Sequence, residues 1–240
     1  MKLTQDSLAV VEHNQHRACC EKGADILTRL FPKVIEWRKL PYELLLNLVA
    51  ESYQWTELQK RPSQLLAVRI ACARLCLGSF FMQDPRYQVL QDIVKQQLNS
   101  AYLTDDDPIY QYLVQFKPDW VNDVFQEQSS FLADLVATPS SQIDYQDWMQ
   151  RMVINDWRLS TFKLKEQYQT VFEMLKGYSQ IALKDTDEFL QFLITVAQYY
   201  EGVDCFNDPI NLRWNRCIVP NAPVLTHHNI IKAFKSGAYL

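Results

Sequence analysis

Glycine is scarce in this chain, which holds five glycines in 240 residues. Hairpins and tight β-turns need residues that tolerate positive φ angles, and glycine is the usual one. A β-sandwich of this size would use more of them. No two glycines lie near each other, so the GxGxxG and GxxxxGKS/T patterns are absent. The scarcity therefore favours helices and argues against dinucleotide-binding and phosphate-loop folds.

Apolar residues recur at three- and four-residue steps through most of the chain, which is the rhythm of an amphipathic helix. We expect an all-α globular bundle of about eight helices. The segment Gln64–Phe81 is apolar on nearly every face and is the candidate for the central helix. The expected helices cover Ala18–Phe31, Tyr42–Gln54, Gln64–Phe81, Arg86–Tyr102, Ile109–Phe116, Trp120–Ala137, Tyr145–Asn155, Leu159–Tyr178 and Asp187–Tyr200.

Breaks in this rhythm set the expected domain organisation. The clearest lies near residue 105, where three Asp residues precede a proline, and a second lies near residue 140. We expect either one helical domain over residues 1–240 or two helical halves, 1–104 and 105–208. Residues 209–240 contain three prolines and scattered apolar residues, which predicts an irregular tail.

The composition is that of a globular protein, with 48% hydrophobic and 22% charged residues. The apolar run Leu8–Val11 is too short for a signal-peptide core. No stretch reaches the roughly 18 apolar residues of a membrane span. Without an export signal, the six cysteines are expected to be reduced thiols, mostly buried as small hydrophobic side chains. We therefore expect a cytoplasmic protein that does not enter a membrane.

Charge is placed unevenly along the chain. Residues 83–208 hold twenty acidic and nine basic residues, whereas residues 209–240 hold four basic residues and no acidic one. The acidic stretch repels nucleic-acid phosphates and attracts cationic partners. Two interpretations stay open: a solvated helical surface with a basic tail folded back on it, or an acidic docking face for a basic protein.

Three Asp-Trp pairs lie in the acidic stretch, and they supply the candidate binding residues. Either the rings pack in the core with the carboxylates exposed, or rings and carboxylates together form a surface that grips a basic partner. The Asp residues near residue 105 would lie at the rim of such a surface. The candidate protein-binding residues are Asp105, Asp106, Asp107, Trp120, Asp123, Asp147, Trp148, Asp156 and Trp157.

The chain offers no recognisable catalytic, cofactor or metal motif. Cys72 and Cys76 share a helix face, but a structural zinc site would need two further ligands, so buried thiols are the better interpretation. His13 and His16 have a permitted spacing for a metal, yet HExxH is absent. The last residue of Asp105–Asp107 is expected to cap the next helix rather than bind calcium. We predict no catalytic residue and no cofactor.

One region resembles a known family. Arg61-Pro62-Ser63-Gln64 opens a helix that runs to Leu77-Gly78-Ser79-Phe80-Phe81, and Asp84-Pro85-Arg86 then precedes an amphipathic stretch to Val94. This order resembles a helical family encoded beside type VI secretion effectors in Gram-negative bacteria. The resemblance covers roughly residues 20–98. The Pro-Trp that usually follows Asp-Pro in the family is replaced by Tyr87 and Gln88. The resemblance implies an accessory, adaptor or immunity protein for a secreted toxin, and it supplies no catalytic residue.

These observations rank binding above catalysis. We expect a protein-binding module, most concretely an immunity or adaptor protein that covers a basic site on a secreted toxin or effector. The partner would be another protein rather than nucleic acid or a membrane, and self-association as a homodimer stays open. Two alternatives remain: an enzyme with an unfamiliar helical active site, and a structural subunit of a larger assembly.

Overall fold

The computed structural model describes residues 5–100, 102–103, 106–114, 131, 134–135, 137–154, 168–182 and 188–212. Within these residues the fold is all-helical and contains no strand, which confirms the expected class. The α-helices are α1 (Gln5–Leu30), α2 (Pro32–Arg38), α3 (Tyr42–Leu58), α4 (Gln64–Leu77), α5 (Gln88–Asn99), α6 (Pro108–Val114), α8 (Tyr145–Ile154), α10 (Tyr168–Ala182) and α11 (Glu188–Glu201). Short 3-10 turns are η1 (Phe81–Gln83), η2 (Pro85–Tyr87) and η3 (Ser140–Gln142).

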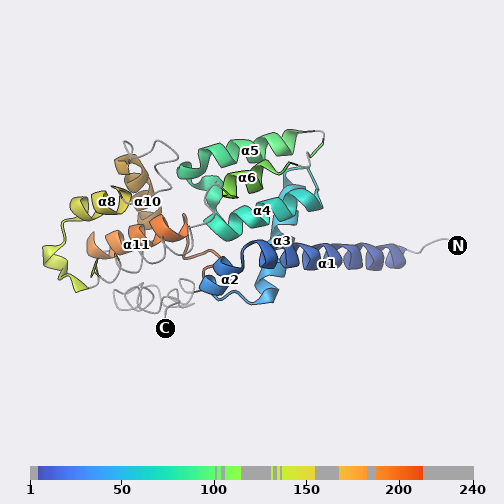
Figure 1. The fold of residues 1–240 in the computed structure, drawn as a ribbon, viewed down its shortest axis with the longest axis horizontal. Helices are drawn as coiled ribbons and strands as arrows, with labels where there is room; N and C mark the ends of the chain where they lie inside the picture. The colour runs from blue at the N-terminus through green and yellow to red at the C-terminus, as the bar shows by residue number, and fades with distance from the viewer. Residues whose placement is uncertain are drawn as a thin grey trace.

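Helices α1 to α6 form the first helix group, and α4 packs against α1, α3 and α6 within it (Figure 1). Ten of the fourteen residues of α4 are buried, which confirms the expected central helix. The helix begins where the Ser63 hydroxyl accepts a hydrogen bond of 3.2 Å from the backbone N–H of Leu66. It ends at Leu77 because Gly78 has a φ of 96°, so the expected extension to Phe81 is wrong.

The N-terminal end of the chain is more helical than the sequence pattern predicted. Helix α1 begins at Gln5 rather than at Ala18. At Gly23 it packs so closely on its neighbours that an added Cβ would lie 2.8 Å from a methyl group of Val49. Pro32, expected only as a break, instead begins α2, because the first turn of a helix does not need the N–H that proline lacks.

Helices α8, α10 and α11 form the second helix group, which has a hydrophobic core of its own (Figure 1). Ten of the fourteen residues of α11 are buried, so α11 is the central helix of this group, as α4 is of the first. The expected helix over Asp187–Tyr200 is thereby confirmed. The break near residue 105 falls before α6, yet α6 places Ile109 and Leu113 in the core of the first group. Most of the expected helix Trp120–Ala137 and nearly all of the tail lie outside the described residues.

The two groups meet where α4 and α11 end. A Cβ on Gly202, which has a φ of 104°, would lie 2.6 Å from the carbonyl oxygen of Leu77. A Cβ on Gly78 would lie 2.9 Å from the carbonyl oxygen of Glu201. Both glycines are therefore required by positive φ angles and by the close approach of two backbones.

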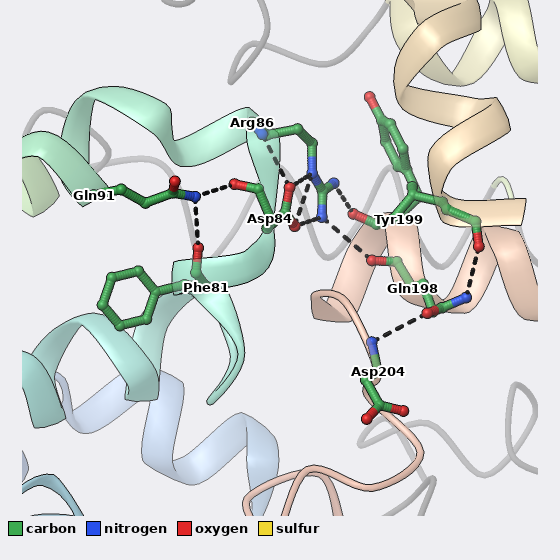
Figure 2. A network of polar contacts seen from close by, with 8 residues as sticks. Phe81, Asp84, Arg86, Gln91, Gln198, Tyr199 and Asp204 are labelled. Atoms are coloured by element: carbon green, nitrogen blue, oxygen red, sulfur yellow. Dashed lines mark hydrogen bonds and ion pairs between the residues drawn. The ribbon is translucent and has the colours of Figure 1, made fainter. Parts of the chain in front are cut away.

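We call this contact between the ends of α4 and α11 the junction. Arg86 lies across it (Figure 2). Its guanidinium donates hydrogen bonds to the Asp84 carboxylate, with Nε 2.9 Å from Oδ1, and to the carbonyl oxygen of Tyr199 at 2.5 Å. Asp84 is 0% exposed and Arg86 is 2% exposed. A buried charge is tolerated only when it is paired and hydrogen-bonded, and both conditions hold here.

A second set of buried polar contacts completes the junction. The Asp208 carboxylate accepts hydrogen bonds from the backbone N–H of Ser79 at 2.7 Å and from its hydroxyl at 2.6 Å. From α2, Arg38 Nη1 lies 3.6 Å from Glu201 Oε2 and also donates to Asn211. The segment that follows α11 is thus tied back to the first group. No described helix has both the length and the apolar composition needed to cross a bilayer.

Candidate functional site

A small cleft opens between α8, α10 and α11 in the second helix group, and we call it the acidic cleft. Its floor is apolar, formed by the buried rings of Phe172 and Phe192 and by the half-buried Met149. Tyr145 lies beside this floor, with its ring centroid 5.0 Å from that of Phe192. The volume is about 60 Å³. Substrate and cofactor pockets usually reach roughly 300–1,000 Å³, so the cleft has room for the end of a single side chain.

Charged side chains form the rim of the acidic cleft. Glu173 and Glu188 are exposed, and the half-buried Lys176 lies with them. None of the three forms an ion pair with another described residue. Two carboxylates and one ammonium leave the rim with a net charge of −1. The rim therefore favours an incoming cation over an anion.

The local sequence explains how these residues are positioned. The Asp144 carboxylate caps α8 by accepting hydrogen bonds from the backbone N–H groups of Gln146 and Asp147, at 2.9 and 3.1 Å. This cap fixes the first turn of α8, which carries Tyr145. Met149 lies one turn further along the same face. Glu188 occupies the first turn of α11, where a negative charge is favourable to the helix dipole.

Of the predicted rim residues near 105, Asp107 makes its contacts within the first helix group. Asp107 caps α6 by accepting a hydrogen bond of 2.9 Å from the backbone N–H of Tyr110, which confirms the capping prediction. The same carboxylate lies 3.2 Å from Nε of the buried Arg69. Asp106 is exposed, and Asp105 lies outside the described residues. Asp107 thus holds helices together within the first group, whereas α8 belongs to the second.

The Asp-Trp pair on α8 divides between surface and core. Asp147 faces outward and pairs with Arg151 one turn away. Trp148 is only 7% exposed, and its ring lies edge-on to Phe131 with the centroids 5.0 Å apart. The expectation of an accessible ring at Trp148 is therefore wrong, because that ring fills the core of the second group. Four further candidates, Trp120, Asp123, Asp156 and Trp157, lie outside the described residues.

Burial also removes part of the acidic stretch from the surface. Asp84, Glu201 and Asp208 are buried in the junction, where each is paired or hydrogen-bonded. Asp134, Asp144, Glu173 and Glu188 remain exposed. The negative charge counted along the sequence is therefore larger than the charge that a partner would meet.

Among the described cysteines, Cys20, Cys72, Cys76 and Cys205 are buried and Cys19 is half-buried. Cys72 and Cys76 are both buried, as expected. Burial, with a smaller contribution from nearby Asp107, raises the pKa of the Cys72 thiol to about 12, which keeps it protonated and unreactive. The described residues contain no group of three or more His, Cys, Asp or Glu side chains that could hold a metal ion. Among the residues that the structure describes, none that lines the acidic cleft is a cysteine, histidine or serine.

The rim and floor of the acidic cleft were not among the residues that the sequence pattern singled out. Part of the signal was present: Glu173 and Lys176 are three residues apart, and Tyr145 and Met149 are four apart, so each pair shares a helix face. The angle at which α8, α10 and α11 pack decides that these faces meet, and spacing along the chain does not contain that angle.

Compared with protein-family models, curated proteins and solved structures, the chain matches none of them. The resemblance noted over residues 20–98 therefore stays a prediction.

Proposed function

We propose that the chain is a protein-binding module whose acidic cleft takes up a basic side chain of a partner protein. The observation that carries the proposal is the pair of exposed carboxylates, Glu173 and Glu188, above a floor of aromatic and thioether side chains. A lysine or arginine side chain has the matching construction, with an apolar stem and a charged end.

Each part of such a side chain finds a partner in the acidic cleft. The methylene stem would pack on Phe172, Phe192 and Met149, and the charged end would lie between the rim carboxylates. Lys176 would compete for those carboxylates, so the partner's cation must displace it. The small volume of about 60 Å³ supports an anchor of one side chain within a wider protein interface, rather than a pocket for a metabolite.

The test uses short fluorescent peptides that differ only at the central residue, which is lysine, norleucine or glutamate. Anisotropy titrations should give tighter binding for lysine than for norleucine, and weakest binding for glutamate. Glu173→Lys should weaken binding of the lysine peptide by about tenfold, because it reverses a charge at the contact. Lys176→Gln should strengthen binding, because it removes the competing ammonium.

The matched control is Glu57→Lys, which makes the same charge change at an exposed position on α3 in the first group. It should change the affinity by less than about twofold, since separated surface charges are screened by salt. Equal weakening by Glu57→Lys and Glu173→Lys would mean that net charge alone governs binding. Equal affinity for the three peptides would contradict the proposal.

The class of partner comes from the family resemblance rather than from the acidic cleft. That resemblance implies a secreted toxin or effector, with this chain as its immunity or adaptor protein. Co-expression with a toxin encoded beside the gene tests this part. Survival that is lost with Glu173→Lys and retained with Glu57→Lys would support neutralisation through the cleft. Unchanged killing in the presence of the wild-type chain would rule out that pairing.

A further inference from the structure

The N-terminal end of helix α1 extends well beyond the other helices of the first group (Figure 1). Its first buried side chain among the described ones is Cys20, and Asn14, Gln15, Arg17 and Ala18 are exposed or half-buried. We call residues 5–15 of α1 the arm. Most of the stability of a protein helix comes from packing along one face. A helical segment that projects from its neighbours is therefore stabilised by a further surface to pack on.

A groove of about 460 Å³ lies next to the arm, between α1 and the start of α4. Its α4 wall includes Leu65, which is 51% exposed on a helix that is otherwise largely buried, and Val68. Its α1 wall carries Cys19, Lys22 and Ile26. The groove begins where the arm leaves the helix group, so the two surfaces are continuous along α1. We call it the α1–α4 groove.

Positions 8, 12, 15, 19, 22 and 26 of α1 recur at alternating steps of four and three residues. This spacing places the six positions along one face of the helix, which we call the seam. The residues there are three apolar ones, Leu8, Cys19 and Ile26, and three polar ones, Glu12, Gln15 and Lys22. The last four of these positions line the α1–α4 groove, and the first two lie in the arm. One seam therefore runs from the arm into the groove.

We infer that two copies of the chain associate through antiparallel α1 helices, with the arm of each copy lying in the α1–α4 groove of the other. An antiparallel pair centred near residue 17 places position 8 opposite Ile26, position 12 opposite Lys22, and Gln15 opposite Cys19. Both members of each pair lie on the seam. The arrangement is closed by a two-fold axis, so it yields a dimer and not a filament.

Length and charge both fit a second copy as the occupant. The groove wall from Gln15 to Ile26 is about 17 Å long, and the arm is about 15 Å long, at 1.5 Å per residue. The arm contains Asp6 and Glu12 and no Lys or Arg, whereas Lys22 is the only charged residue among the described ones that line the groove. A polar pair such as Glu12 with Lys22 in the seam would set the register of the two helices.

The first test is the mass of the full-length chain in solution, measured by light scattering from about 1 to 100 μM. The inferred dimer has twice the 28.2 kDa of one chain. Leu65→Asp should weaken dimerisation by about tenfold or more, because it places a charge in the groove. Leu58→Asp is the control, since Leu58 is 79% exposed and does not line the groove. A wild-type chain that stays monomeric at 100 μM would overturn the inference.

Exchanging the charges at positions 12 and 22 tests whether the occupant of the groove is a second copy of the chain. Lys22→Glu and Glu12→Lys should each weaken the dimer, and the double variant should restore it, because each contact between positions 12 and 22 of the two copies then joins opposite charges again. The two positions are about 15 Å apart along one helix, so they cannot pair within a chain. Failure of the double variant to restore the dimer, with helix content unchanged by circular dichroism, would refute the inferred register.

Discussion

The junction and the acidic cleft use the same kinds of side chain in opposite ways. In the junction, Asp84 and Arg86 are buried and satisfy each other, and an aromatic ring, that of Tyr199, lies 5.2 Å from the guanidinium. In the acidic cleft, Glu173 and Glu188 are exposed above aromatic rings and pair with no described cation. Both regions draw their carboxylates from the same acidic stretch of sequence. Pairing and burial, rather than residue type, therefore separate the charged groups that stabilise the fold from those that remain accessible on the surface.

The largest expected effect is in the junction. Arg86→Gln leaves the Asp84 carboxylate buried without its countercharge, and we expect a loss of about 3–5 kcal/mol in the free energy of unfolding. Arg151→Gln removes the exposed partner of Asp147 and should cost less than about 1 kcal/mol. Urea denaturation followed by circular dichroism measures both. Similar losses for the two variants would show that burial does not distinguish the Arg86–Asp84 pair from the exposed Arg151–Asp147 pair.

Because Arg86→Gln risks preventing folding, a double variant keeps the comparison measurable. Asp84→Asn together with Arg86→Gln removes both charges, so no lone charge stays buried. The double variant should unfold at a higher urea concentration than Arg86→Gln alone. A double variant that is less stable than the single one would show that the ion pair does not dominate at this position.

A glycine pair gives the next largest contrast. Gly202→Ala should cost roughly 2–4 kcal/mol, because the new Cβ would meet the Leu77 carbonyl oxygen at 2.6 Å and the backbone has a positive φ. Gly177→Ala, within α10, meets nothing within 4 Å and should stabilise the protein by about 0.5–1 kcal/mol through helix propensity. Thermal unfolding of the two variants should therefore shift the melting temperature in opposite directions. A shift of the same sign would contradict the close approach of α4 and α11.

The smallest effect concerns Asp204, at the edge of the junction. Burial raises the pKa of this carboxyl, opposed by a hydrogen bond from Asn207 at 2.7 Å and reinforced by nearby Asp208. A raised pKa means that Asp204 favours folding in its protonated form, and this contribution is lost as the pH rises above the ordinary value of 3.8 through the folded-state pKa.

Asp204→Asn removes that penalty and suits the left-handed backbone at this position, where φ is 56°. We expect a gain of roughly 0.5 kcal/mol at pH 7 that vanishes below about pH 3.8, allowing for solvent screening of the half-buried group. Urea midpoints measured at pH 3 and pH 7 check this. A larger gain at pH 3 than at pH 7 would reverse the assigned direction.

Periodicity predicted much of the fold, because a helix face must be apolar to bury itself. The helical rhythm of α3 and α11 and the nearly all-apolar segment of α4 could be recognised in the sequence for this reason. The start of α1 was not, since the residues from Glu12 to Arg17 are polar and give no stripe. The end of α4 at Gly78 depends on a backbone angle forced by its approach to Gly202, which lies 124 residues away in the sequence.

The candidate site was harder to predict than the fold. The Asp-Trp pairs were predicted as binding residues because a carboxylate and an aromatic ring are adjacent in the sequence. Helix geometry nevertheless places Asp147 on the surface and Trp148 in the core. Adjacent residues on a helix point about 100° apart, so neighbours in sequence seldom share a surface. Glu173 and Glu188 come together only because α10 and α11 pack side by side, as the close contact of the two helices shows.

In the proposed function, the exposed carboxylates of the acidic cleft, and not the acidic stretch as a whole, recognise a basic side chain. The most direct measurement is the dissociation constant of the central-lysine peptide for the wild-type chain and for the double variant Glu173→Gln and Glu188→Gln. We predict that affinity falls by about tenfold or more, since both charges at the contact are removed while the paired charges of the junction remain. Unchanged affinity in this variant, with the free energy of unfolding also unchanged, would contradict the account.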